Sequence, residues 1–156
     1  MSNVSEKTAV AAREMIAFLV ASQEFCVDVM SVREIRVWTP ATPIAHAPNY
    51  VVGVVNLRGA VLPIIDFAAR LGFPPTQPTT RHAILVAQIG ERSVGLLVDG
   101  VSEILTVTQD QIQPPPRVGA EIASKFVSGV VAIQNRMICV VTLDSLVAQS
   151  VDSMAA

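Results

Sequence analysis

Strand-length runs of aliphatic residues, separated by glycine, proline or polar pairs, predict an all-β chain. Two such runs, Val54–Leu57 and Ala60–Ile65, flank the pair Arg58-Gly59. Gly59 can adopt the positive φ that a tight turn needs, so the two runs are predicted to form an antiparallel hairpin. Arg58 then lies at the tip of the hairpin, either as an ordinary exposed turn residue or as a charge placed beside apolar surface for docking.

The same pattern predicts the remaining elements. Asp66 can cap a short helix, Phe67–Leu71, that Gly72 ends. The segment Met30–Val37 fits either a short helical turn or a strand. Further strands are predicted at Met15–Val20, Glu24–Val29, Ala83–Ile89, Ser93–Val98, Val101–Val107, Val127–Ile133 and Met137–Thr142, loops at Trp38–Pro48 and Pro114–Pro116, a linker at Pro74–Thr80, a helical turn at Glu121–Lys125 and a closing helix at Leu143–Gln149.

An internal repeat relates the two halves of the chain. The segment Gly53–Val55 recurs 76 residues later as Gly129–Val131, and at that offset the Arg58-Gly59 turn meets Gln134-Asn135. The first part of the chain repeats at an offset of 69, where Val32–Ile35 matches Val101–Ile104 and Met15–Val20 overlies Ile84–Ile89. The order of the elements is therefore the same in both halves.

Two similar β units follow from this repeat. About five strands in so short a segment can close into a small barrel, which removes the exposed edges of the sheet. Each unit alone would bury little surface, so we expect two barrels packed on an aliphatic interface with a cleft between them. The expected divisions are a flexible segment at 1–12, one domain at 13–149 made of barrels at about 13–80 and 81–149, and a short tail at 150–156.

Composition excludes several classes of function. The chain has 156 residues, of which 51% are hydrophobic and 4% aromatic, so Val, Ile, Leu and Ala are expected to build the core. A net charge of -2 with scattered Lys and Arg gives no basic surface for nucleic acid. No apolar run approaches the roughly 18 residues of a spanning helix, and no signal core follows the polar N-terminus. We expect a cytoplasmic protein without membrane insertion.

Catalytic constellations are not evident. His46 and His82 have no partner near in sequence, and no metal-ligand or nucleophile spacing is present, so no enzyme, metal or cofactor is predicted. Cys26 and Cys139 lie within strand-like runs and are expected to be buried free thiols. The competing possibility is an enzyme that uses the cleft, in which His46, His82, Cys26 or Asp99 would be essential for turnover.

The pair Asp99-Gly100 is predicted to be a bend between strands. It could also form a hairpin turn, but the repeat aligns it with Met30-Ser31, which are poor turn formers. A bend at this point redirects the chain toward Glu103. Glu34 and Glu103 then occupy equivalent places in the two units.

Four segments of this chain together resemble the CheW family of bacterial chemotaxis coupling proteins. They are Gly53–Gly59 (Gly-Val-Val-Asn-Leu-Arg-Gly), Leu62–Asp66, Leu97–Glu103 and Gly129–Val131, and the resemblance extends from about Glu14 to Val147. It implies a pair of five-stranded SH3-like barrels. It also implies a non-enzymatic adaptor that joins the cytoplasmic tips of chemoreceptors to the regulatory domain of the histidine kinase CheA.

The resemblance also implies roles for particular residues. Receptor-coupling positions of the family fall on Val32, Glu34, Gly53, Asn56, Leu57, Arg58, Gly95 and Ile104, and kinase-facing positions fall on Val29 and Phe126. An alternative keeps the fold but assigns it to a chemotaxis-like system with another output, such as motility by pili. A fragment of CheV, which fuses this domain to a receiver, is disfavoured because the chain ends before a receiver could fit.

Overall fold

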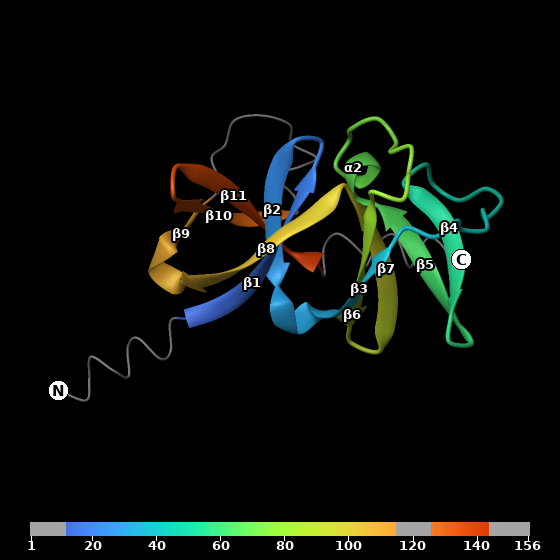
Figure 1. The fold of residues 1–156 in the computed structure, drawn as a ribbon, viewed down its shortest axis with the longest axis horizontal. Helices are drawn as coiled ribbons and strands as arrows, with labels where there is room; N and C mark the ends of the chain where they lie inside the picture. The colour runs from blue at the N-terminus through green and yellow to red at the C-terminus, as the bar shows by residue number, and fades with distance from the viewer. Residues whose placement is uncertain (1–11, 115–125, 144–156) are drawn as a thin grey trace.

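The computed structural model describes residues 12–114 and 126–143, and these residues form an all-β protein, as predicted (Figure 1). Within the described residues, the short helix α2 (Phe67–Arg70) and the 3-10 turns η1 (Val29–Ser31) and η2 (Gln109–Gln111) accompany the strands, and a helix begins at Leu143. The strands are β1 (Ala12–Val20), β2 (Gln23–Asp28), β3 (Val32–Val37), β4 (Val51–Leu57), β5 (Ala60–Asp66), β6 (Ala83–Ile89), β7 (Arg92–Val98), β8 (Gly100–Thr108), β9 (Ile112–Gln113), β10 (Val127–Ile133) and β11 (Arg136–Val141).

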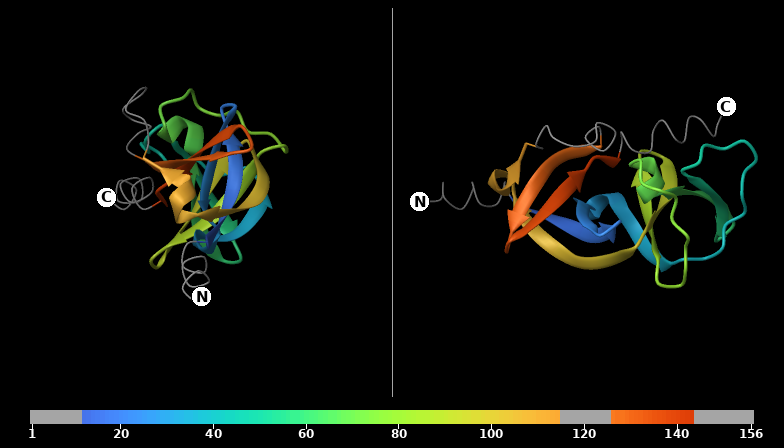
Figure 2. Two further views of the ribbon diagram at one scale, coloured as in Figure 1. Left: turned by 90° about the vertical axis from the view of Figure 1, so that its left-hand side faces the viewer. Right: turned by 90° about the horizontal axis from the view of Figure 1, so that it is seen from above.

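The strands form two curved sheets that lie side by side along the molecule (Figure 2). The order in the five-stranded sheet is β3-β6-β7-β5-β4, and in the six-stranded sheet it is β8-β1-β2-β11-β10-β9. The sixth strand, β9, has two residues and was not predicted. The predicted turn at 121–125, the tail at 150–156 and all but the first residue of the closing helix lie outside the described residues.

The two sheets do not divide the chain near residue 80, where the sequence repeat placed the boundary. The five-stranded sheet is built from residues 32–98, whereas the six-stranded sheet combines residues 12–28 with residues 100–141. The first hairpin of each half belongs to the sheet of the other half. The β1–β2 hairpin joins the six-stranded sheet through β8, and the β6–β7 hairpin joins the five-stranded sheet through β3. The repeat marks equivalent segments correctly, but equivalent segments do not belong to one folding unit.

Strand registers confirm the repeat at the level of single residues. Glu34 pairs with Val86 in the five-stranded sheet, and Glu103 pairs with Ala17 at the equivalent place, each beside a β-bulge. The parallel pairings agree in the same way, since β5 pairs with β7 as β11 pairs with β2. Because a one-residue slip would turn every side chain to the opposite face, the shared register means that the two sheets bury equivalent positions.

The chain crosses between the sheets at two equivalent places. At the first, Asp28 caps η1 by accepting a hydrogen bond from the backbone N–H of Met30 at 2.9 Å, and β3 follows. The segment Met30–Val37, for which the sequence allowed either a helical turn or a strand, therefore contains both: the end of η1 and then β3. At the second, Asp99 is a bend from which β8 continues into the other sheet, as predicted.

Alternation along the strands separates three cores. On β1, Met15 and Ala17 face the interior of the six-stranded sheet, whereas Ile16, Phe18 and Val20 face the other sheet. The interior of the five-stranded sheet is formed by a further group, Leu62, Ile64, Ile84, Val86 and Leu97. Strands buried on both faces explain why the sequence shows continuous apolar runs in place of alternation.

The interface between the sheets is aromatic at its centre. Phe18, Phe25 and Phe67 are buried, and the ring centroids of Phe67 lie 5.2 Å from those of both other rings. Aliphatic residues surround these rings and make up most of the interface, as predicted, and the cluster of phenylalanines at its centre was not predicted. Phe67 packs edge to face against Phe18 and Phe25, which stack on each other, and the three buried rings lie where the sequence predicted a cleft.

Candidate docking site

The tip of the β4–β5 hairpin exposes a single guanidinium. Arg58 and Gly59 both have positive φ, 51° and 87°, which is the conformation of a two-residue turn matched to the twist of its strands. Asn56 closes the turn, since its Oδ1 accepts a hydrogen bond from the N–H of Gly59 at 2.8 Å. The side chain of Arg58 is 68% exposed, as the hairpin pattern predicted.

Glu34 on β3 forms an ion pair with this guanidinium. The Nη2 of Arg58 binds one carboxylate oxygen of Glu34, and the Nη1 of Arg36 binds the other at 3.2 Å. The hydrogen bond from Arg58, supported by Arg36, lowers the pKa of Glu34, and the same hydrogen bond raises the pKa of Arg58. The carboxylate of Glu34 is therefore held between two guanidinium groups, and the cluster has a formal net charge of one positive unit.

Exposed aliphatic side chains lie on the same two elements. Ile35 and Val37 on β3 are 48% and 63% exposed, and Val61 on β5 is 73% exposed. Ile35 pairs with Leu85 and Val61 precedes the interior residue Leu62, so both lie on the outer face of the sheet, whereas Glu34 pairs with Val86 and meets Arg58 at its end. Exposed arginine and exposed aliphatic side chains are both typical of protein-docking surfaces. We call the Glu34–Arg58 pair, together with Ile35 and Val61 on the outer face of the same sheet, the Arg58 surface.

The six-stranded sheet carries an equivalent group, which the sequence did not reveal. Glu103 corresponds to Glu34, and it accepts a hydrogen bond from Nη1 of Arg136 on β11 at 2.6 Å. Glu24 on β2 binds the same guanidinium through both of its oxygens, at 2.9 Å from Nε and 2.6 Å from Nη2. Hydrogen bonds from Arg136 lower the pKa of Glu24. The signal was hidden because Arg136 follows the turn directly as the first residue of β11, whereas the position equivalent to Arg58 is Gln134.

The predicted receptor-coupling residues divide between exposed and buried places. Asn56, Glu34 and Arg58 meet at the hairpin tip, where Leu57 and Val32 are half-buried beside them in sequence. Ile104 is 60% exposed, but it lies on β8 in the other sheet. Three of the eight residues therefore meet at the hairpin tip, two lie on the adjoining strands, two are buried glycines, and one lies in the other sheet.

Gly53 and Gly95 are buried, so each has a structural reason to be glycine. Gly53 has φ 151°, and a Cβ there would lie 2.3 Å from the carbonyl oxygen of Thr42. A Cβ on Gly95 would lie 2.6 Å from Cδ1 of Ile64 and 2.8 Å from Cγ2 of Ile84. Both glycines permit close packing beneath the surface.

The two predicted kinase-facing residues differ in exposure. Val29 is half-buried in η1, at the first crossing between the sheets. Phe126 is only 4% exposed, and the guanidinium of Arg70 lies 4.7 Å from its ring centroid and 4.6 Å from that of Tyr50. The arginine is therefore held between two aromatic rings.

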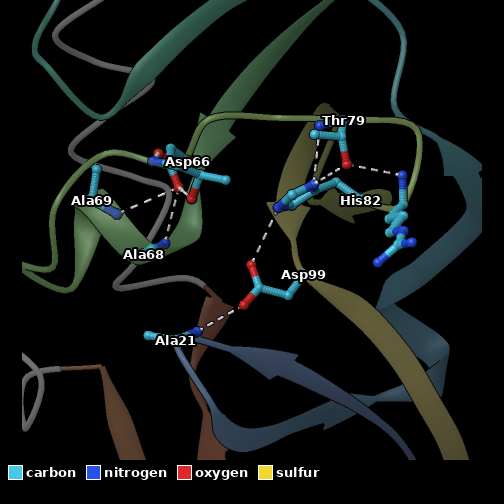
Figure 3. Close-up of polar contacts among 9 residues, drawn as sticks. Ala21, Asp66, Ala68, Ala69, Thr79, His82 and Asp99 are labelled. Carbon is cyan, nitrogen blue, oxygen red and sulfur yellow. Dashed lines mark hydrogen bonds and ion pairs between the residues drawn. The ribbon is translucent and has the colours of Figure 1, made fainter.

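Histidine and aspartate residues outside this surface hold loops in place (Figure 3). The carboxylate of Asp66 caps α2 and also accepts hydrogen bonds from the backbone N–H and hydroxyl of Thr76, at 2.6 and 2.8 Å. His82 accepts a hydrogen bond from the N–H of Thr79 at 3.0 Å, and its other ring nitrogen lies 3.6 Å from Asp99. The predicted linker at 74–80 is thus fastened at both ends.

The cysteines face opposite sides of the six-stranded sheet. Cys26 packs in the core inside that sheet, whereas Cys139 packs toward the interface with the other sheet. Both are free thiols, as predicted, and Cys139 is half-buried. Burial raises the pKa of Cys26 to about 12 and also raises the pKa of Cys139. Neither thiol is activated as a nucleophile.

A shallow hollow of about 400 Å³ lies beside the β1–β2 turn, and not between the sheets. It is lined by Ser22, Gln23, Glu24, Arg136, Met137 and Cys139. Among the described residues, no group of three or more His, Cys, Asp or Glu side chains could hold a metal ion. In that part of the chain, no helix has the length and hydropathy needed to cross a membrane.

Comparison with known proteins decides the family. The model of the CheW-like domain matches residues 14–151. The chain belongs to the CheW family. A chemotaxis protein CheW from Rhizobium meliloti is 58% identical, over 94% of both chains, and one from Klebsiella aerogenes is 34% identical, over 86% of this chain and 81% of the relative. The crystal structure of the scaffolding protein TtCheW from Thermoanaerobacter tengcongensis matches with a TM-score of 0.79 and 29% identity, covering 86% of this chain and 91% of that one.

Proposed function

We propose that this protein is a non-catalytic adaptor that couples methyl-accepting chemoreceptors to the histidine kinase CheA and so controls autophosphorylation of the kinase. The observation that carries the proposal is the Arg58 surface. It presents a permanent charge at the end of a sheet whose outer face exposes aliphatic side chains, which suits recognition better than proton transfer. Relatives across most of the chain bear the names chemotaxis protein and scaffolding protein, which supports the same role.

The receptor is the partner that fits the Arg58 surface. Chemoreceptor tips are helical hairpins, and an amphipathic helix offers an apolar stripe flanked by charged residues. Ile35 and Val61 can cover such a stripe, while Arg58 pairs with an acid beside it. Val32, Asn56 and Leu57 support the hairpin and β3, and Gly53 and Gly95 allow the strands beneath to pack closely.

CheA engages a separate part of the molecule in this proposal. Val29 lies at the crossing between the sheets, where Met30 is 87% exposed and offers apolar surface to the kinase regulatory domain. Phe126 acts from the interior, because its ring fixes Arg70 and the segment that leads into β10. Ile104, in the second sheet, extends the surface that the partners share. The protein works in the cytoplasm and is recruited to membrane-associated receptor arrays.

The competing enzyme hypothesis finds no support in the placement of its residues. His82 and Asp99 lie together but hold the linker and the β1–β2 turn, where Asp99 accepts a hydrogen bond from the N–H of Ala21 at 3.0 Å. Cys26 is buried with a raised pKa, and His46 lies in an exposed loop. These groups have no common site.

Reconstitution tests the proposal directly. Purified protein, the cognate CheA and a receptor cytoplasmic fragment are combined, and phosphate incorporation into CheA is measured with each component omitted in turn. Kinase activity that rises only when all three are present supports the coupling role. Unchanged activity with a folded protein would reject it, and activation of a kinase from another chemotaxis-like system would favour the alternative output.

A further inference from the structure

His82 lies between the linker 74–80 and β6, and its contacts reach both sheets (Figure 3). Its carbonyl oxygen accepts a hydrogen bond from the backbone N–H of Trp38 at 3.1 Å. Its ring nitrogen Nε2 lies 3.6 Å from Oδ1 of Asp99, and Oδ2 of that carboxylate accepts a hydrogen bond from the N–H of Ala21 at 3.0 Å. The ring and the carboxylate therefore connect the start of β6, in the five-stranded sheet, with the β1–β2 turn of the six-stranded sheet.

The hydrogen bonds of the ring assign its tautomer. Nδ1 of His82 accepts a hydrogen bond from the backbone N–H of Thr79 at 3.0 Å, so this nitrogen carries no proton. Because a neutral imidazole has one N–H donor and one acceptor, its hydrogen must be on Nε2, which faces Asp99. The backbone N–H of His82 donates in turn to the carbonyl oxygen of Thr79 at 3.0 Å. The neutral ring thus closes the turn between these two residues.

A second proton on the ring would change its partner within Thr79. A hydrogen on Nδ1 would point at the N–H of Thr79, and two donors cannot form a hydrogen bond with each other. The hydroxyl oxygen of Thr79 lies 3.3 Å from the same nitrogen and accepts a hydrogen bond from the N–H of Arg81 at 3.2 Å. A hydroxyl oxygen has two lone pairs, so it can accept from Nδ1 as well. Protonation therefore exchanges the backbone N–H of Thr79 for its side-chain oxygen.

Asp99 is the carboxylate that favours the added proton. Its side chain is 40% exposed and that of His82 is 17% exposed, so the pair is partly shielded from water. The linker 74–80, β6 and the β1–β2 turn contribute no titratable side chain. The nearest charged residues along the chain and along β3 are Arg81, which is exposed, and Arg36, which is already paired with a glutamate. Protonation of the ring therefore creates one new ion pair, with Asp99.

We propose that His82 is a proton-dependent junction between the linker 74–80 and the crossing at Asp99. The neutral ring holds the backbone of the linker through the N–H of Thr79. A proton taken from water onto Nδ1 releases that N–H, and the ion pair with Asp99 then ties the five-stranded sheet to the β1–β2 turn. Histidine suits such a junction because its charge can change near neutral pH. The junction is a device of the fold and does not depend on the identity of any docking partner.

Nuclear magnetic resonance of the wild-type protein tests the exchange. Long-range proton–nitrogen spectra should show the Nε2–H tautomer of His82 at about pH 8. As the pH is lowered, protection of the Thr79 amide against hydrogen exchange, corrected for the intrinsic rate, should fall about fivefold or more with the midpoint of the ring. His46, the other histidine of the chain, lies in an exposed loop and is the control in the same spectra. An Nδ1–H tautomer, or protection of Thr79 that does not follow the ring, overturns the proposal.

Two variants test the two contacts of the charged ring separately. Asp99→Asn removes the charge but keeps an oxygen for the N–H of Ala21, and Thr79→Val removes the hydroxyl oxygen but keeps the backbone N–H. Each should lower the midpoint of the His82 titration by about half a pH unit, because each removes a partner of the charged ring. The midpoint of His46 should stay the same. An unchanged midpoint of His82 in either folded variant overturns the proposal, and the exposed position of Thr79 keeps the test available if Asp99→Asn does not fold.

Discussion

The ion pair between Glu34 and Arg58 joins the two edges of the five-stranded sheet. Glu34 lies on β3 at one end of the strand order, and Arg58 joins β4, at the other end, to β5. Contact between residues from opposite ends requires the sheet to curl on itself. We infer that the sheet approaches a barrel whose mouth is covered by this pair, with Arg58 presented at the rim.

Charge reversal at the rim should disable docking without unfolding the protein. An exposed ion pair contributes little to stability, so Arg58→Glu is expected to keep a near wild-type unfolding midpoint. The new carboxylate would repel both Glu34 and an acid on the receptor, so receptor affinity should fall by about tenfold or more. Arg81→Glu makes the same change of charge on an exposed residue away from the hairpin and is the matched control. Unchanged affinity for Arg58→Glu would contradict the docking role.

Two glycines of one hairpin should respond very differently to alanine. In Gly53→Ala the new Cβ would press on the backbone of Thr42, so we expect a loss of about 1–3 kcal/mol or more in the free energy of unfolding. At Gly59 nothing lies within 4 Å, so Gly59→Ala should cost only the strain of a positive φ, about 1 kcal/mol. Urea unfolding measures both, and equal losses would show that the contact with Thr42 is unimportant.

The buried carboxylate of Asp66 should stabilise both α2 and the segment after it. Asp66→Ala removes the helix cap and leaves Thr76 without its acceptor, which should cost about 2–4 kcal/mol in the free energy of unfolding. Asp66→Asn keeps one carbonyl oxygen and should lose less. Limited proteolysis between residues 72 and 80 should accelerate more in the alanine variant, and equal cleavage of both variants would argue against this anchoring.

Stability in acid should depend on Glu24. The pKa of Glu24 is lower in the folded protein than its ordinary value of 4.5. Its contribution to the free energy of unfolding is therefore complete above pH 4.5, and it is lost as the pH falls through the pKa of the folded state. Glu24→Gln should therefore be less stable than the wild type at neutral pH, and the difference should shrink as the pH falls below 4.5. Glu91→Gln, on the exposed β6–β7 turn, is the control. A difference that does not change with pH would show that the ion pair is not responsible.

The two cysteines should label slowly in the native protein. Raised pKa values keep both thiols protonated at pH 8, and protonated thiols react poorly with disulfide reagents. Cys26 should react only on unfolding, and the half-buried Cys139 should react first. Because their strands place them on opposite faces, oxidation should not join them within one chain, and an intramolecular disulfide found by mass spectrometry would contradict this placement.

Local chemistry explains which elements the sequence predicted well. The Arg58-Gly59 turn, the Asp66 cap and the bend at Asp99 each depend on residues adjacent in the chain, and all three are confirmed. The alignment of the two halves was also correct, because the β-bulges beside Glu34 and Glu103 lie at the offset of 69 residues that the repeat predicted.

Contacts between distant segments account for what the sequence missed. The exchange of the β1–β2 and β6–β7 hairpins between the sheets does not change the order of elements along the chain, so the sequence repeat could not reveal it. Arg136 meets Glu24 across 112 residues, and nothing near either residue marks the pair. Three phenylalanines among five in the chain gather at one interface only after both sheets have formed.

The exchange of hairpins sets an order in which the molecule can be completed during translation. The segment from β3 to β7 is continuous, so the five-stranded sheet can form once the ribosome has released residue 98. The β1–β2 hairpin, made first, must wait for β8 and β11 before it has neighbours on both sides. Until then the face that packs inside the six-stranded sheet, with Met15, Ala17 and Cys26, is exposed to other nascent chains, and strands made late in translation protect the strands made first.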